Sequence, residues 1–230
     1  MSNPAIPDII SVVGTSYLQP ISDLLEKLLK RPVERQGPAG TGHHENGYSA
    51  AIIVLLVTVL ESYAARLRFV RVEEETAGNL STPALLAAYF PALPTREELI
   101  EVFLCRNVLA HNHIWHLDVS DCSQFGSPTL ATPAELGFQT NKHYDQIVDV
   151  AARQTRTLQL NVNPIAVDRS DARKVFEVVW RTLQFMSSQN YSHTPLAGAS
   201  VPFRGKRRQF GDLRQEITDG GESAGTQSWH

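Results

Sequence analysis

The sequence predicts a mainly α-helical bundle of four to five helices, with a small β element inserted between the last two core helices. Apolar residues recur at helical spacing in five segments, and Pro and Gly separate these segments. Between the last two of them, apolar and polar residues alternate as they do in half-buried strands. A hydrophobic fraction of 42% and a charged fraction of 20% are those of a globular chain, which excludes a disordered or fibrous protein.

The first two helices flank a glycine-rich stretch. Residues 17–31 place leucines on one stripe and charged residues on the other, which predicts an amphipathic helix. Residues 34–47 lack periodicity and predict a loop in which His43 and His44 face solvent. Residues 48–72 are apolar almost all round in their first half, which indicates a helix in the middle of the bundle.

The next two helices have clearer limits. A short helix is predicted over residues 82–89. The fourth helix opens with the Thr-x-x-Glu pattern of a capping box, from Thr95 to Glu98, and runs to His111.

The pattern changes over the insertion, which covers about residues 114–167. Residues 114–119 and 156–162 alternate apolar and polar side chains and predict two strands, and residues 142–152 predict a short helix. A last helix follows, capped by Asp168 or Ser170 and ending at Gln189.

The chain therefore divides into a helical domain over residues 1–193 and a polar tail over residues 194–230, which we expect to be flexible because it has few large apolar side chains. Five basic and four acidic residues give the tail a net charge of +1, which leaves 16 Lys+Arg and 20 Asp+Glu, or −4, for the body. Its basic run is a weak candidate for RNA binding, through Lys206, Arg207 and Arg208.

Composition also predicts the compartment. Two cysteines without a CxxC pattern form no disulfide framework, and the amino terminus has no secretory signal, so we expect a cytoplasmic protein. The most apolar run, residues 50–60, is about half the roughly 20 residues that a membrane span needs, and Glu61 ends it. We therefore expect a core helix and no contact with a membrane.

The most informative segment is the end of the fourth helix. At 100° per residue, Arg106, Asn107 and His111 share an arc with apolar residues. A guanidinium and an imidazole on such a face need partners, a ligand or a second subunit, because unpaired buried polar groups are costly. Glu61 of the second helix is the candidate partner of Arg106, and Cys105 is expected to be a packing residue. A purely structural interpretation also stays open, in which Glu61 and Arg106 form an internal salt bridge and His111 only ends its helix.

The element Arg106-Asn107-x-x-x-His111 resembles the signature of the HEPN superfamily (higher eukaryotes and prokaryotes nucleotide-binding domain). The stretch LESYAARLR from Leu60 is similar to the preceding helix of that family, in which an acidic residue often supports the arginine. The resemblance covers residues 17–190 in architecture, but it is specific only around these two motifs.

The resemblance implies a homodimer in which two copies of Arg106 and His111 form one composite site. It implies metal-independent endoribonuclease activity without a cofactor, in which histidine activates the 2′-hydroxyl and arginine stabilises the charge on the phosphate. Products would be a 2′,3′-cyclic phosphate and a 5′-hydroxyl. Asn107 would orient the phosphate or the histidine. The implied roles are those of a toxin or an anti-phage defence effector, with an antitoxin or defence-system protein as a partner.

One branch of the family carries a modifiable tyrosine two residues beyond the histidine. This chain has His113 there, so that form of control is not predicted.

Three alternatives remain open. His111, His113 and His116, followed by Asp118, are a metal-site pattern if they lie on a strand, although His111 and His113 diverge on a helix. The chain is alternatively a non-catalytic module of the same family that binds RNA, a nucleotide or a protein. The third alternative is a purely structural dimerisation domain.

Overall fold

The computed structural model describes residues 13–33, 41–70, 80–111, 117–118, 129–130, 144–190, 196 and 198–218. It is mainly helical, as predicted, with short antiparallel strand pairs. The helices of the bundle are η1 (Val13–Tyr17), α1 (Leu18–Leu29), α2 (His43–Val70), α3 (Thr82–Tyr89), α4 (Arg96–His111) and α6 (Arg169–Gln189).

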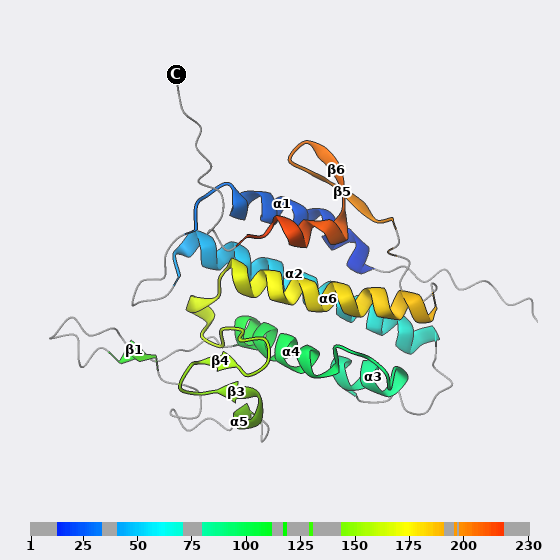
Figure 1. The fold of residues 1–230 in the computed structure, drawn as a ribbon, viewed down its shortest axis with the longest axis horizontal. Coiled ribbons are helices and arrows are strands. Elements are labelled where there is room, and N and C mark those ends of the chain that lie inside the picture. The colour runs from blue at the N-terminus through cyan, green and yellow to red at the C-terminus, as the bar shows by residue number, and fades with distance from the viewer. Residues whose placement is uncertain are drawn as a thin grey trace, which may run out of the picture.

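The helices form three layers (Figure 1). The helix α1 lies on one side of the bundle, α2 and α6 lie side by side in the middle, and α3 and α4 lie on the other side. The helix α2 contacts α1, α6 and α4, so it is the centre of the core. Its fully buried apolar side chains are Ile52, Ile53, Leu56, Val57, Val59, Leu60, Tyr63 and Leu67.

This central position accounts for the composition of α2. From His43 to Phe69 the helix is long and apolar enough to cross a membrane, but half of its most apolar window is buried inside the protein. A helix that packs against three neighbours needs apolar residues on most of its faces. The structure therefore explains the apolar run by packing in the core.

The helix α2 begins earlier than predicted, at His43, so residues 43–47 are helical and not part of a loop. The buried carboxylate of Glu45 causes this difference. Its Oε1 atom accepts hydrogen bonds from the backbone N and the Nε of Arg169, at 3.0 and 2.7 Å. His44 is partly buried, and its Nε2 lies 3.1 Å from the carbonyl oxygen of Lys27. The predicted solvent exposure is therefore correct for His43 and wrong for His44.

The predicted ends of the other helices agree well with the structure. The helix α3 covers residues 82–89, and α4 begins directly after Thr95. Asp168 caps α6 by accepting hydrogen bonds from the backbone N atoms of Ser170 and Asp171. Asp171 also accepts from the side chain of Asn161 at 2.8 Å. Burial raises the pKa of the Asp171 carboxyl, and the hydrogen bonds from Asn161 oppose this shift.

The insertion between α4 and α6 contains strands, as predicted, but they are only two residues long. They form two antiparallel pairs, β1 (Leu117–Asp118) with β2 (Thr129–Leu130) and β3 (Val148–Asp149) with β4 (Gln154–Thr155). The predicted helix over residues 142–152 shrinks to α5 (Tyr144–Ile147).

The second predicted strand, over residues 156–162, is largely a turn. The buried carboxylate of Glu101, on α4, accepts hydrogen bonds from the backbone N atoms of Thr157 and Leu158, at 2.8 and 2.7 Å. These two donors are therefore not available to a neighbouring strand.

The prediction of a flexible tail is wrong for residues 198–218. They form the hairpin β5 (Ser200–Phe203) and β6 (Lys206–Gln209) and the helix η6 (Phe210–Glu216), which pack on α1 and α6 (Figure 1). The few apolar residues of this segment are almost all buried in the core: Val201, Phe203, Phe210, Leu213 and Ile217. Residues 219–230 lie outside the described part of the chain.

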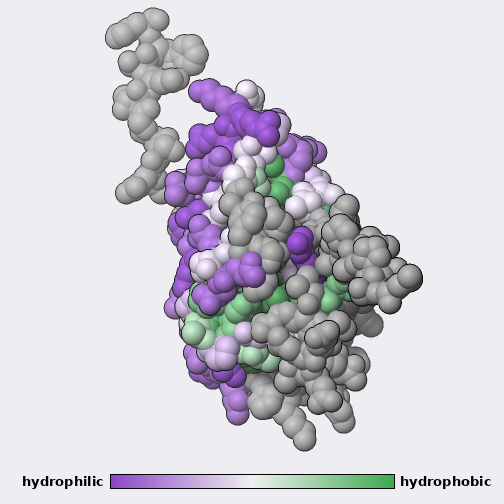
Figure 2. Space-filling model, turned by 90° about the vertical axis from the view of Figure 1, so that its right-hand side faces the viewer, coloured by the Kyte–Doolittle hydropathy of each residue, from purple (hydrophilic) through white to green (hydrophobic). Residues whose placement is uncertain are grey.

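Some large hydrophobic side chains remain exposed. Where α2 ends and α3 begins, Phe69 is 56% and Leu80 37% exposed, and on α4 Ile100 is 43% exposed. The space-filling view also shows hydrophobic residues gathered on one face of the molecule, next to hydrophilic ones (Figure 2). An exposed apolar area of this kind is typical of a contact surface.

Candidate functional site

The backbone of α4 positions the motif. Arg106 and Asn107 lie in the second-last turn of the helix, and His111 is its last residue. Residues four apart on a helix lie on the same face, so the Cα of His111 follows that of Asn107 by one turn. The side chain of His111 and residues 112–116, which include His113 and His116, lie outside the described residues.

The structure brings Arg106 and Glu61 together, as the sequence predicted. The Nη2 atom of Arg106 donates to Oε1 of Glu61 across the contact between α4 and α2. The two side chains are 18% and 36% exposed, so the ion pair lies at the edge of the core. The guanidinium carbon lies 5.4 Å from the centre of the Phe103 ring, which is close enough for a cation–π contact.

The ion pair leaves part of the guanidinium free. Arginine has five N–H donors, and Glu61 accepts from one nitrogen. The Nε atom is buried and has no hydrogen-bond partner among the described residues. The Nε atoms of Arg66 and Arg68 on α2 are in the same state, so this feature does not single out Arg106. The chemistry of phosphate fits such a donor set.

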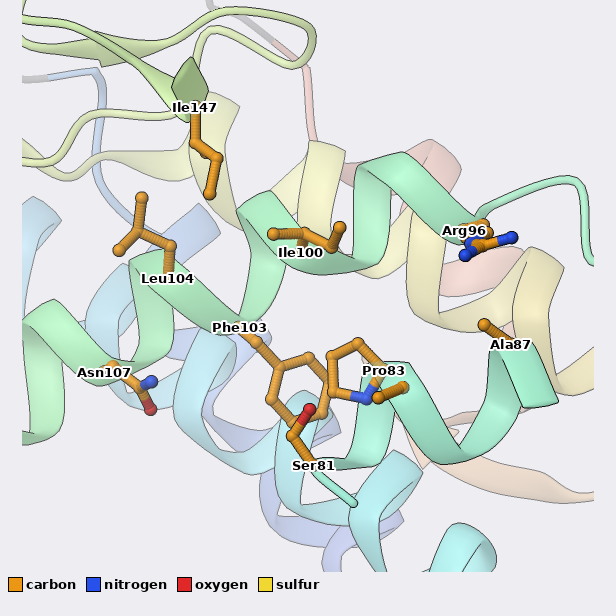
Figure 3. A pocket seen from close by; sticks show the side chains of 10 residues that line it. Ser81, Pro83, Ala87, Arg96, Ile100, Phe103, Leu104, Asn107 and Ile147 are labelled. Atoms are coloured by element: carbon orange, nitrogen blue, oxygen red, sulfur yellow. The ribbon is translucent and has the colours of Figure 1, made fainter. Parts of the chain in front are cut away.

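Asn107 points elsewhere. It is exposed and lines a groove of about 430 Å³ between α3, α4 and α5 (Figure 3). Arg96 and Asn107 lie at opposite ends of this groove, and Ile100 lies between them. The groove is mostly apolar and is lined by Ser81, Pro83, Ala84, Ala87, Arg96, Ile100, Phe103, Leu104, Asn107 and Ile147. Arg106 and Asn107 therefore lie within one arc of the helix, as predicted by their spacing, but Arg106 reaches α2 and Asn107 reaches the groove.

The opposite face of α4 is structural. Cys105 is buried, and its Sγ lies 3.8 Å from the carbonyl oxygen of Asn161. Burial raises the pKa of the Cys105 thiol far above its ordinary value, and the charge of Asp171 raises it further. The thiol therefore stays protonated, as expected for a packing residue.

The basic run is far from this site. Lys206, Arg207 and Arg208 lie on β6, beyond α1, whereas Arg106 lies on α4 at the other side of the α2–α6 layer (Figure 1). Arg208 also pairs with Glu216 at 2.8 Å. One protomer cannot use these residues and Arg106 on the same phosphate.

The described ranges contain no group of three or more His, Cys, Asp or Glu side chains that could hold a metal ion. The alternative of a site at His111, His113, His116 and Asp118 falls on side chains that the structure does not describe.

Sequence reasoning missed two groups that shape the site. The carboxylate of Glu101 holds the insertion against α4, and Ile147 of the insertion closes one side of the groove. An acidic residue on the buried side of α4 was the available signal for Glu101. The sequence has no local signal for Ile147, because its contact with α4 spans the insertion.

Comparisons of the chain with protein-family models, with curated proteins and with solved structures give no significant match.

Proposed function

We propose that this chain is a HEPN-type, metal-independent endoribonuclease that acts as a homodimer in the cytoplasm. The observation that carries the proposal is the ion pair between Glu61 and Arg106. It fixes a partly buried guanidinium near the end of α4, one residue before Asn107 and five residues before His111.

The proposed chemistry needs two kinds of group. The imidazole of one His111 takes the proton of the 2′-hydroxyl, the 2′-oxygen attacks the phosphorus, and the bond to the 5′-oxygen breaks. His111 of the partner subunit protonates the leaving 5′-oxygen. The Arg106 guanidinium donates to the phosphoryl oxygens as negative charge grows on them. The products are a 2′,3′-cyclic phosphate and a 5′-hydroxyl.

The exposed face of α4 supports the dimer. Ile100 is 43% exposed in the middle of the helix, and the apolar groove beside it ends at Asn107. A second copy that packs on this face would bury Ile100 and bring two α4 helices together by a two-fold axis. Ile100→Glu is then expected to give a monomer without cleavage activity, measured by size-exclusion chromatography with light scattering. Asp23→Lys, an exposed change on α1 at the other side of the bundle, is the control.

Cleavage of labelled RNA in the presence of a chelator tests the activity. Wild-type protein is expected to cut and to leave cyclic phosphate ends. Removal of the general base by His111→Ala lowers the rate by about 10²–10⁴-fold, and removal of the charge by Arg106→Ala lowers it by about 10²–10³-fold.

Arg181→Ala is the matched control. Arg181 also forms an ion pair with α4, through Glu98 at 3.2 Å, but it lies on α6 and pairs about two turns of α4 before Arg106. Its loss is expected to leave cleavage unchanged. If His111→Ala cleaves like the wild type, the proposed mechanism is wrong, and RNA binding without cleavage would favour a non-catalytic module.

The proposed cellular role is that of a toxin or a defence effector, with an antitoxin or defence-system protein as a partner. Expression of the wild type is expected to stop growth, and His111→Ala is expected to relieve the arrest at equal protein levels.

A further inference from the structure

The hairpin β5–β6 ends in an open strand edge. Within the described part of the chain, β6 pairs with β5 alone, and all four of its residues are exposed. Arg204 and Gly205 form the turn, with φ values of 47° and 73°. Two positive φ values at a two-residue turn match the twist of a regular hairpin. The edge of β6 is therefore a well-formed strand.

The hairpin is fixed to the bundle. Val201 and Phe203 of β5 are 5% and 2% exposed. The hydroxyl of Ser22, on α1, donates to the carbonyl oxygen of Pro202 at 2.7 Å. Glu26 of the same helix accepts a hydrogen bond from the backbone N of Arg204. The outer edge of β6 is thus held in position before anything binds, which lowers the entropy cost of binding.

The register shows which backbone groups face outward. Hydrogen-bonded and non-hydrogen-bonded pairs alternate along an antiparallel ladder. The backbone N of Phe210 donates to the carbonyl oxygen of Ala199 at 2.9 Å, so Val201 with Arg208 and Phe203 with Lys206 are also hydrogen-bonded pairs. The N–H and C=O groups of Arg207 and the N–H of Gln209 therefore point away from β5, whereas the C=O of Gln209 opens the helix η6.

The side chains of β6 are cationic on both faces. Lys206 and Arg208 lie on one face, beside a cavity of about 200 Å³ that Phe203, Arg204 and Glu216 complete. Glu216 pairs with both Arg204 and Arg208, so one carboxylate faces three cations there. Arg207 lies on the other face, where its Nε donates to Ser200 at 2.6 Å. The strand thus places excess positive charge on a chain whose net charge is −3.

We propose that β6 is a docking edge for an acidic, extended segment of a partner protein. The segment adds to β6 as a third strand, pairs with the N–H and C=O of Arg207 and the N–H of Gln209, and places carboxylates beside Lys206 and Arg208. A strand both donates to and accepts from the outward backbone groups and also meets the charges, whereas the phosphate oxygens of an RNA can only accept and would leave the outward C=O of Arg207 unpaired. The position of β6 across the bundle from α4 also separates this surface from the proposed RNA site.

Fluorescence anisotropy with the full chain tests the proposal. The probe is a labelled eight-residue peptide of alternating glutamate and valine. Its control is the same peptide with N-methyl groups on alternate residues, which keeps the charges and blocks strand pairing. The unmodified peptide is expected to bind at least about tenfold more tightly than the methylated one, since several backbone hydrogen bonds depend on the edge.

Two variants distinguish the contribution of backbone hydrogen bonds to peptide binding from that of charge. Lys206→Glu with Arg208→Glu replaces attraction by repulsion and is expected to weaken binding at least about tenfold. Arg207→Pro removes an outward N–H without breaking a bond to β5, so it should bind more weakly than Arg207→Ala. Thermal melts check that the variants fold, and if Arg207→Pro melts early, the methylated peptide alone decides the role of the backbone.

Three results would overturn the proposal. They are no binding of the acidic peptide at low salt, equal binding of the methylated peptide, and binding of a labelled uridine oligonucleotide but not the peptide. The last result would make β6 a nucleic-acid surface. All three leave the cleavage assay with His111→Ala unaffected, so the two proposals fail separately.

Discussion

Replacing Glu61 by Gln tests whether the ion pair with Arg106 positions the guanidinium for catalysis. The change removes the negative charge and keeps an oxygen that can accept a hydrogen bond. Both side chains reach solvent, at 18% and 36% exposure, so the stability of the pair is discounted to about 1 kcal/mol. For a chain of this size, that lowers the melting temperature by about 2–4 °C.

The expected effect on catalysis is much larger. A guanidinium that swings away by about 1 Å can cost about 10²-fold in rate. Glu61→Gln is therefore expected to lower the single-turnover cleavage rate by about 10–10²-fold, and Glu61→Ala by more, with little change in KM and in the pH profile. The assay is single-turnover cleavage of labelled RNA, combined with thermal melts of the same samples.

The matched control is Glu98→Gln, which breaks the ion pair of α4 with Arg181. It should cost similar stability and leave the rate unchanged. The positioning role is wrong if Glu61→Gln keeps the wild-type rate within about threefold, or if Glu98→Gln loses as much.

Three further predictions concern the fold. The Phe210 ring is 1% exposed and its centre lies 5.0 Å from that of Phe176. Phe210→Ala should therefore lower the unfolding free energy, measured with urea, by about 3–5 kcal/mol. If the C-terminal segment were a flexible tail, the unfolding free energy would not change. Glu45→Gln leaves the buried Arg169 guanidinium without its charge partner and should lower the urea midpoint by a similar free energy, about 3–5 kcal/mol, at unchanged slope. Burial raises the pKa of the Cys105 thiol and keeps it protonated. Iodoacetamide at pH 8 should therefore leave Cys105 unmodified in the native protein and alkylate it in urea, as measured by peptide mapping.

Local signals predicted the helices well. The short helix over residues 82–89 is correct to the residue, and Asp168, one of the two predicted caps, begins the last helix. Both are read from adjacent side chains, because a cap or a proline acts on the backbone next to it. The pair of Glu61 with Arg106 was also predictable, since each is a charge on an otherwise apolar helix face.

Non-local contacts explain what sequence reasoning missed. The start of α2 depends on Glu45, whose partner Arg169 is 124 residues away. The C-terminal segment has few apolar residues, but nearly all of them are buried, and composition counts residues without showing where they point. Gly211 illustrates the fit, because an added Cβ would lie 2.2 Å from the Trp180 ring. Only the packed structure shows that this polar segment belongs to the core.

The helix α4 combines these effects and has one face on which the proposed second subunit would pack. On one side of α4, Glu98 forms an ion pair with α6, and Glu101 accepts hydrogen bonds from the insertion. On another side, Arg106 forms an ion pair with α2. Polar residues are thus interspersed with apolar ones because neighbours of different chemistry contact the helix on several sides. The face with Ile100 and Asn107 has an exposed apolar side chain and a groove within the described structure. A two-fold partner at this face would bury both and bring two copies of the motif together, which the catalytic proposal requires.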